Sequence, residues 1–154
     1  MVAPLRSNSW SMGGPGMSLS QSDSPTDGVT AIHGVDECSP RVRLRLWLET
    51  SEGVFFGIGR ALLLAKIEEY GSLKKAAGDL GMSYRAAWGK IKKTEKILGV
   101  QLIIQSGSKR EGYQLTDFGA LLKDRYLFWF NAVEEEAVKK ARELFPWPVK
   151  SYED

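Results

Sequence analysis

The chain of 154 residues contains one cysteine and one histidine. A single cysteine excludes an intrachain disulfide and fits a reducing compartment. The histidine, His33, lies in an N-terminal stretch without sustained periodicity, so the rest of the chain has no Ser–His or Cys–His catalytic pair. No apolar run approaches the length of a membrane span, and the N-terminus lacks the apolar core of a signal peptide. We therefore expect a cytoplasmic protein that is not an enzyme.

Motifs for metals and cofactors are also scarce. His33 and Cys38 are two potential ligands, whereas a metal site usually takes three or four. The segment GIGRALL, which starts at Gly57, lacks the third glycine of a dinucleotide-binding loop and the Gly-Lys-Ser/Thr of a P-loop. We interpret it as a strand-to-helix connection and expect no metal and no cofactor.

Charge is distributed unevenly along a chain whose net charge is only +2. Residues 1–40 hold one basic and four acidic residues, and 17 of them are Ser, Gly or Pro, which predicts a disordered N-terminal tail. Residues 72–112 hold nine basic and three acidic residues. Such a local excess of positive charge favours a polyanionic partner.

A helix-turn-helix is predicted between Gly71 and Gly99. Ser72 can cap a short helix that ends at Leu80, and Ser83 can cap a longer helix over residues 84–98. Gly81 stands between the two helices, where a sharp turn needs a residue without a Cβ.

The second of these helices has one apolar face and one basic face when its residues are placed about 100° apart. We expect the inward face to hold Tyr84, Ala87, Ile91, Thr94 and Leu98, with Trp88 and Glu95 flanking it. The opposite face carries the candidate DNA-binding residues of the helix, which are Arg85, Gly89, Lys92, Lys93 and Lys96. Cations on such a face suit phosphate neutralisation, and an arginine in the first turn can reach a base. An ordinary solvated lysine face is the alternative.

Strands are predicted on both sides of the helix-turn-helix. Alternation from Arg41 to Glu49 is typical of a half-buried strand, and residues 54–57 form a shorter strand before a helix over residues 60–70. Residues 100–105 and 113–115 predict a hairpin whose polar tip, SGSKREG, carries Lys109 and Arg110. A hairpin at this place is a wing, which can contact a phosphate or the minor groove, or is a plain surface hairpin.

A long last helix is predicted from the Thr116 cap to Phe145, where prolines stop it. Residues 126–130 are five consecutive large apolar or aromatic residues, which project in every direction from a helix. We expect a second copy of the chain to cover those that the core cannot, so the active species is a homodimer. A helix buried on both sides within one chain is the alternative. The candidate interface residues are Leu122, Tyr126, Trp129, Phe130 and Val133.

These patterns together predict a mainly α protein with small β elements, a winged helix-turn-helix plus a long C-terminal helix. We expect a disordered tail over residues 1–40, a DNA-binding domain over residues 41–115, a dimerisation helix over residues 116–145 and a C-terminal tail over residues 146–154.

Within this order, GSLKKAA, GMSYRAAW and LTDFG resemble the N-terminal DNA-binding domain of ModE-type molybdate-responsive regulators, over about Val42 to Tyr126. LysR-type winged helices are more distant. The resemblance implies that Ser83, Tyr84 and Arg85 face DNA and that Trp88 is mainly a packing residue. We include Ser72 among the DNA-binding candidates.

The chain departs from that family in two places. Its wing tip is charged where the family has a glycine-rich tip, and we expect no molybdate-binding β-barrel domain after the long helix. We therefore expect no molybdate site. The predicted function is a dimeric DNA-binding transcriptional regulator, of metal or oxyanion transport genes by analogy. The alternative is a winged-helix interaction module with a protein or RNA partner.

Overall fold

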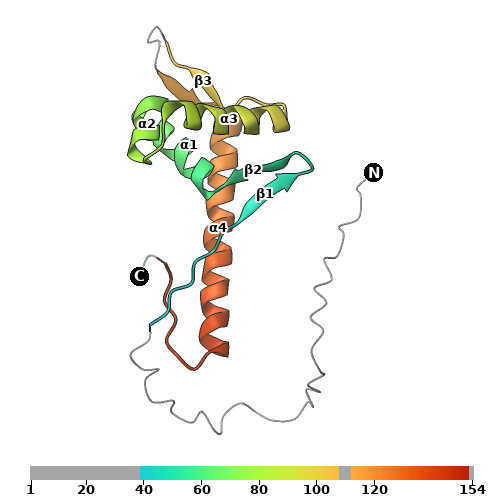
Figure 1. Ribbon diagram of the computed structural model, residues 1–154, viewed down its shortest axis with the longest axis vertical. Coiled ribbons are helices and arrows are strands. Elements are labelled where there is room, and N and C mark those ends of the chain that lie inside the picture. The colour runs from blue at the N-terminus through green and yellow to red at the C-terminus, as the bar shows by residue number, and fades with distance from the viewer. Residues whose placement is uncertain (1–38, 108–111, 153–154) are drawn as a thin grey trace. The chain divides into compact units, whose positions relative to one another are not determined.

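The computed structural model describes residues 39–107 and 112–152. Within these ranges two short hairpins and four helices alternate, with the helix-turn-helix in the middle and the longest helix last (Figure 1). The elements are β1 (Trp47–Thr50), β2 (Gly53–Gly57), α1 (Ile58–Tyr70), α2 (Leu73–Asp79), α3 (Tyr84–Leu98), β3 (Ile103–Gln105), β4 (Tyr113–Leu115) and α4 (Asp117–Leu144).

The core surrounds α1, which packs against α2, α3 and α4. Leu63, Leu64 and Ile67 of this helix are 0% exposed, because α1 is covered on several sides by other elements. Phe56 of β2 joins them and meets the ring of Tyr126 on α4 edge to face, with 5.2 Å between the ring centroids. Burial of a large apolar side chain contributes roughly 1.5–3 kcal/mol, so this cluster is the main source of stability.

The start of α4 is fastened to the loop before β3. Thr116 caps α4 by accepting a hydrogen bond from the Gly119 backbone at 2.9 Å, and it donates its own hydroxyl to the Gln101 carbonyl at 2.7 Å. Gly119 is buried against the same loop, where an added Cβ would overlap the carbonyl oxygen of Leu102 and lie 3.0 Å from its carbonyl carbon. The predicted Thr116 cap is confirmed, and the glycine three residues later proves to be a close backbone contact.

Two predicted strands are shorter in the structure. The strand predicted from Arg41 begins only at Trp47; the residues before it are extended and join Lys150 through one isolated parallel bridge at Arg41. The strand predicted over residues 100–105 begins at Ile103. Before it, the Leu102 backbone donates to the Glu95 carboxylate and accepts from the Thr116 backbone, and the Gln101 carbonyl accepts from the Thr116 hydroxyl.

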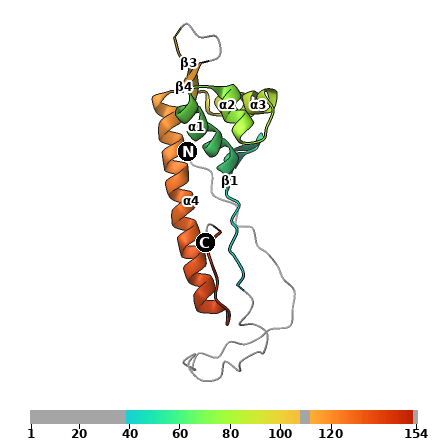
Figure 2. The same cartoon turned by 90° about the vertical axis from the view of Figure 1, so that its left-hand side faces the viewer.

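The chain after α4 turns back along the C-terminal half of that helix (Figure 2). Val149 is 4% exposed and Val138 of α4 is 5% exposed. Arg142 donates from Nε to the carbonyl of Val149 at 2.7 Å. The Lys150 backbone N–H donates to the Pro40 carbonyl at 3.0 Å, and its carbonyl accepts from the Val42 N–H at 3.0 Å. The segment that we predicted as a C-terminal tail is therefore packed over residues 149–150, while the domain boundaries stay a prediction.

Candidate nucleic-acid interface

The helix-turn-helix has the caps and the turn that its sequence predicts. Ser72 accepts a hydrogen bond from the Lys75 backbone at 3.3 Å, and Ser83 accepts one from the Ala86 backbone at 3.1 Å. Gly81 has a φ of 67°, a left-handed conformation that favours glycine. The predicted helix over residues 84–98 agrees with the observed bounds of α3.

The inward face of α3 differs from the prediction at its beginning. Ala87, Ile91 and Thr94 are 0% exposed, as expected. Tyr84, which we expected to pack inward, is 46% exposed because it lies in the first turn, beyond the edge of the core. Its ring stacks on Trp88 instead, with 6.4 Å between centroids and 9° between planes. Glu95 takes a place on the buried side and is only 8% exposed.

The outward face of α3 carries free positive charge. Arg85 and Lys96 are exposed there, and Lys93 is exposed on the side toward the β1–β2 hairpin, where its Nζ would lie 3.6 Å from a Cβ on Gly53; none of the three forms an ion pair with another described residue. Gly89 lies on the same face, and a Cβ added there would meet no atom within 4 Å. A helix with exposed cations around a gap in its side chains can lie against a polyanion without first breaking internal pairs.

Lys92 behaves differently from these cations. Its ammonium lies 2.6 Å from the Glu95 carboxylate and 4.5 Å from the centroid of the Trp88 ring. This side chain, a predicted phosphate contact, is therefore directed along the flank of α3 rather than outward. The sequence could have predicted this ion pair, because Glu95 follows Lys92 by three positions, and residues three apart on a helix are neighbours.

The wing is a two-stranded sheet that is also attached to the turn between α1 and α2. β3 and β4 are antiparallel, with Ile103 opposite Leu115. The junction of α1 and α2 adds a third partner, since the Tyr113 backbone donates to the carbonyl of Gly71 at 3.0 Å and Ser72 forms a bridge with Gly112. Ser72 is thus half-buried between α2 and the wing. Lys109 and Arg110, the predicted cations of the wing tip, lie outside the described residues.

Two further cations, Lys74 and Lys75, are exposed in the first turn of α2 and form no ion pair within the described ranges. These two lysines contribute to the basic excess of residues 72–112 but were not among the predicted DNA-binding residues. Their position directly after a helix cap was the available signal, because the first helix of a helix-turn-helix crosses the DNA backbone.

The predicted dimer residues do not share one surface. Tyr126 is 2% exposed and donates its hydroxyl to the carbonyl of Leu46 at 2.7 Å, so it belongs to the core of its own chain. Leu122 and Phe130 are partly buried against that core, and Val133 is half-buried. Trp129 remains 39% exposed. The most exposed large side chain in this part of α4 is Phe128, at 77%.

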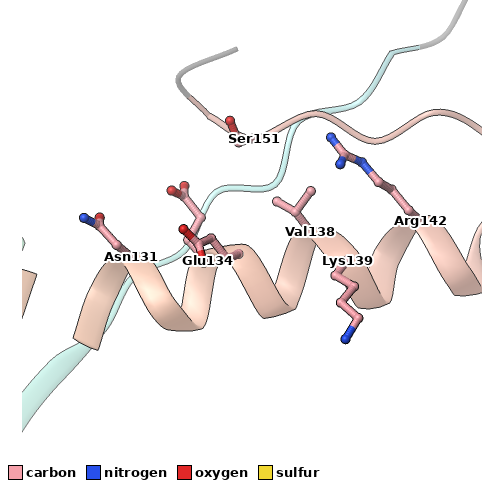
Figure 3. Close-up of a pocket in the computed structure, with 7 residues that line it drawn as sticks. Asn131, Glu134, Val138, Lys139, Arg142 and Ser151 are labelled. Carbon is pink, nitrogen blue, oxygen red and sulfur yellow. The ribbon is translucent and has the colours of Figure 1, made fainter. Parts of the chain in front are cut away.

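A polar hollow of about 400 Å³ lies beside the C-terminal half of α4 (Figure 3). Both carboxylates and cations line it, including Glu134, Lys139 and Arg142, so it offers no field of a single sign. The described residues contain no group of three side chains suited to a metal ion. Among the same residues, no helix combines the length and apolar character needed to cross a bilayer.

A helix-turn-helix followed by a β-hairpin and a long helix defines a winged helix-turn-helix protein, so the predicted fold class is confirmed. Residues 60–120 match the family model described as bacterial regulatory helix-turn-helix protein, lysR family. That segment begins in α1 and ends in the first turns of α4, so it contains the whole winged helix-turn-helix.

The chain is also 33% identical over 98 residues to the molybdenum transport protein ModE of Azotobacter vinelandii. The similarity covers 62% of this chain and 35% of the length of that protein. The resemblance of the winged helix-turn-helix to ModE-type and LysR-type regulators is therefore confirmed.

Three solved structures are similar to parts of the chain. The complex of the CbnR DNA-binding domain with DNA covers 56% of this chain and 97% of its own, with a TM-score of 0.49 and 18% identity. The complex of the BenM DNA-binding domain with benA site 1 DNA covers 57% of this chain and 96% of its own chain, with a TM-score of 0.47 and 18% identity. ArgP from Mycobacterium tuberculosis covers 60% of this chain and 41% of its own chain, with a TM-score of 0.42 and 18% identity.

Proposed function

We propose that this protein is a DNA-binding transcriptional regulator that places α3 in the major groove and acts as a homodimer in the cytoplasm. The observation that carries the proposal is the exposed charge of Arg85 and Lys96 on the outward face of α3, with exposed Lys93 beside it and none of the three in an ion pair with a described residue. This face belongs to the segment that matches regulatory helix-turn-helix proteins. The function is binding rather than catalysis.

Each side chain of the face has a separate role in the proposal. Arg85, in the first turn of α3, reads a base edge, since the N-terminal residues of a recognition helix reach the bases. Lys93 and Lys96, further along, neutralise phosphates. Gly89 leaves the space in which the DNA backbone can approach the helix closely.

The second copy of the chain is proposed to pack on the exposed side of α4. Leu121 and Phe128 are 49% and 77% exposed and lie two turns apart on one side of this helix, with Trp129 beside them. The exposed charges Asp124 and Arg125 lie between Leu121 and Phe128 on this stripe, and large exposed apolar side chains gathered on one side of a helix are typical of an interface. A two-fold axis through the stripe brings two recognition helices to one side of the duplex, about one helical turn apart.

The regulated genes are proposed by analogy only. The ModE relative is named a molybdenum transport protein, which favours target genes for the transport of a metal or an oxyanion. Sequencing the fragments that the protein retains from its own genome tests this, because the genes beside the retained sites show what is regulated.

Replacing Arg85 with alanine is expected to weaken operator binding by about 1–3 kcal/mol and to relax the preference at one base pair. Lys96→Ala is expected to weaken binding to all sequences alike and to lower the slope of log affinity against log salt by about one. Fluorescence anisotropy with the retained fragments, over a series of salt concentrations, measures both effects.

Lys90→Ala is the matched control for these variants. Lys90 is an exposed lysine of the same helix, about 120° around its axis from Lys96, so its loss should leave affinity and salt slope unchanged. Unchanged operator affinity in both Arg85→Ala and Lys96→Ala would contradict the proposal. It would favour the alternative of a protein or RNA partner, which a pull-down with the same variants would then identify.

A further inference from the structure

Three residues on one flank of α3, Trp88, Lys92 and Glu95, connect this helix to both strands of the wing. They follow one another at spacings of four and three, so their side chains lie along one line of the helix. Lys92 stands in the middle and contacts both neighbours. We call these three residues the wing anchor.

Glu95 holds the first strand. One carboxylate oxygen, Oε1, accepts hydrogen bonds from the backbone of Leu102 at 2.8 Å and of Ile103 at 3.3 Å. The other oxygen, Oε2, is bound by Lys92 at 2.6 Å. A buried carboxylate is costly without partners, and here the backbone donors and the ammonium supply them. The start of β3 is thereby attached to α3.

Trp88 holds the second strand. Its ring lies 5.9 Å from the ring of Tyr113 on β4, centroid to centroid. Lys92 Nζ lies over the face of the same indole, a favourable cation–π position. The ammonium of Lys92 therefore links the group that binds β3 to the group that packs on β4.

We infer that the wing anchor sets the angle between the β3–β4 hairpin and α3, and that Lys92 is a positioning residue for DNA recognition rather than a phosphate contact. The inference rests on the proposed function. Two DNA-contacting elements add their affinities only when both fit the duplex at once. The α1–α2 junction holds one edge of the wing through Gly71 and Ser72, and on the α3 side the wing anchor is the contact, so Lys92 influences how the hairpin is tilted toward the DNA beside the site that α3 reads.

The test compares Lys92→Met, which keeps the apolar stem and removes the charge, with Lys92→Arg, which restores it. Hydroxyl-radical footprinting on a retained operator, with anisotropy in parallel, reports where the protein touches the duplex. Lys92→Met is expected to lose protection on the wing side of the half-site and about tenfold in affinity. It should keep the base preference of α3, and Lys92→Arg should restore the footprint.

Tyr113→Leu and Lys96→Met are the companion variants. Tyr113→Leu removes the partner of Trp88 on β4, so it should lose the same protected positions as Lys92→Met, which keeps the inference testable if Lys92→Met fails to fold. Lys96→Met should weaken binding with an unchanged footprint. The inference is overturned if Lys92→Met weakens binding with an unchanged footprint, as expected for Lys96→Met. It is also overturned if Lys92→Met and Tyr113→Leu both fold and both keep the wild-type footprint. A wild-type protein that protects no duplex contradicts the proposed function itself.

Discussion

Gly119→Ala is expected to be the most destabilising single-methyl change in the winged domain. The added Cβ would overlap the Leu102 carbonyl oxygen, and backbone atoms cannot rotate away as a side chain can. Overpacking of this kind costs about 1–3 kcal/mol or more, against a gain of about 1 kcal/mol when alanine replaces glycine within a helix. We expect the steric overlap to outweigh the gain in helix propensity, with a melting temperature about 10 °C lower.

Gly78→Ala separates the close contact from the general effect of the substitution. Gly78 is an exposed glycine within α2, and a Cβ there meets nothing within 4 Å. Alanine should stabilise this helix by about 0.5–1 kcal/mol and raise the melting temperature. Thermal unfolding followed by circular dichroism measures both variants. Equal melting temperatures for the two would show that α4 does not approach the Leu102 loop as closely as the structure indicates.

Phe128→Glu is expected to convert the proposed homodimer to a monomer. A glutamate at this position would remove the most exposed apolar side chain of the stripe and place a second acidic charge near Asp124, which opposes association. A monomer contacts one half-site at a time, so affinity for a palindromic operator should fall by about 100-fold or more. Sedimentation velocity at micromolar concentration and anisotropy on the operator measure the two effects.

Leu144→Glu is the matched control, since Leu144 is also a large exposed side chain of α4, at 70%. It lies about 160° around the helix axis from Phe128 and near the C-terminal end. Its replacement should leave mass and affinity unchanged. The dimer proposal would be wrong if the wild-type protein sedimented as a monomer while binding a palindromic site tightly, or if both variants remained dimeric.

The helix-turn-helix is the part of the fold that the sequence by itself determined. The bounds of α3, the caps at Ser72 and Ser83, and the left-handed turn at Gly81 all depend on residues within a few positions of each other. Capping and turn formation are local interactions, so they are visible in a short window of sequence. The periodicity of α3 placed Ala87, Ile91 and Thr94 inward for the same reason.

The division of α4 between core and surface needed the tertiary structure. Five large residues in a row predicted that some would stay exposed, and Phe128 does. The sequence did not determine which of the five would be buried, because the positions of Phe56 and the Leu46 carbonyl depend on how other segments pack against α4. Tyr126 contacts both, and its hydrogen bond to Leu46 joins residues 80 positions apart in the sequence. It is therefore buried in the core and is not part of the exposed dimer surface that we predicted.

The roles of Lys92 and Gly119 were likewise decided only by the tertiary structure. A helical wheel places Lys92 beside Arg85 as one more cation, yet a neighbouring carboxylate and the Trp88 ring hold its ammonium along the flank. Glu95 is buried because the backbone of a later segment supplies its hydrogen bonds. Gly119 is required by the approach of that same segment. Contacts between residues distant in sequence depend on how the helices pack, and no periodic pattern within one helix encodes them.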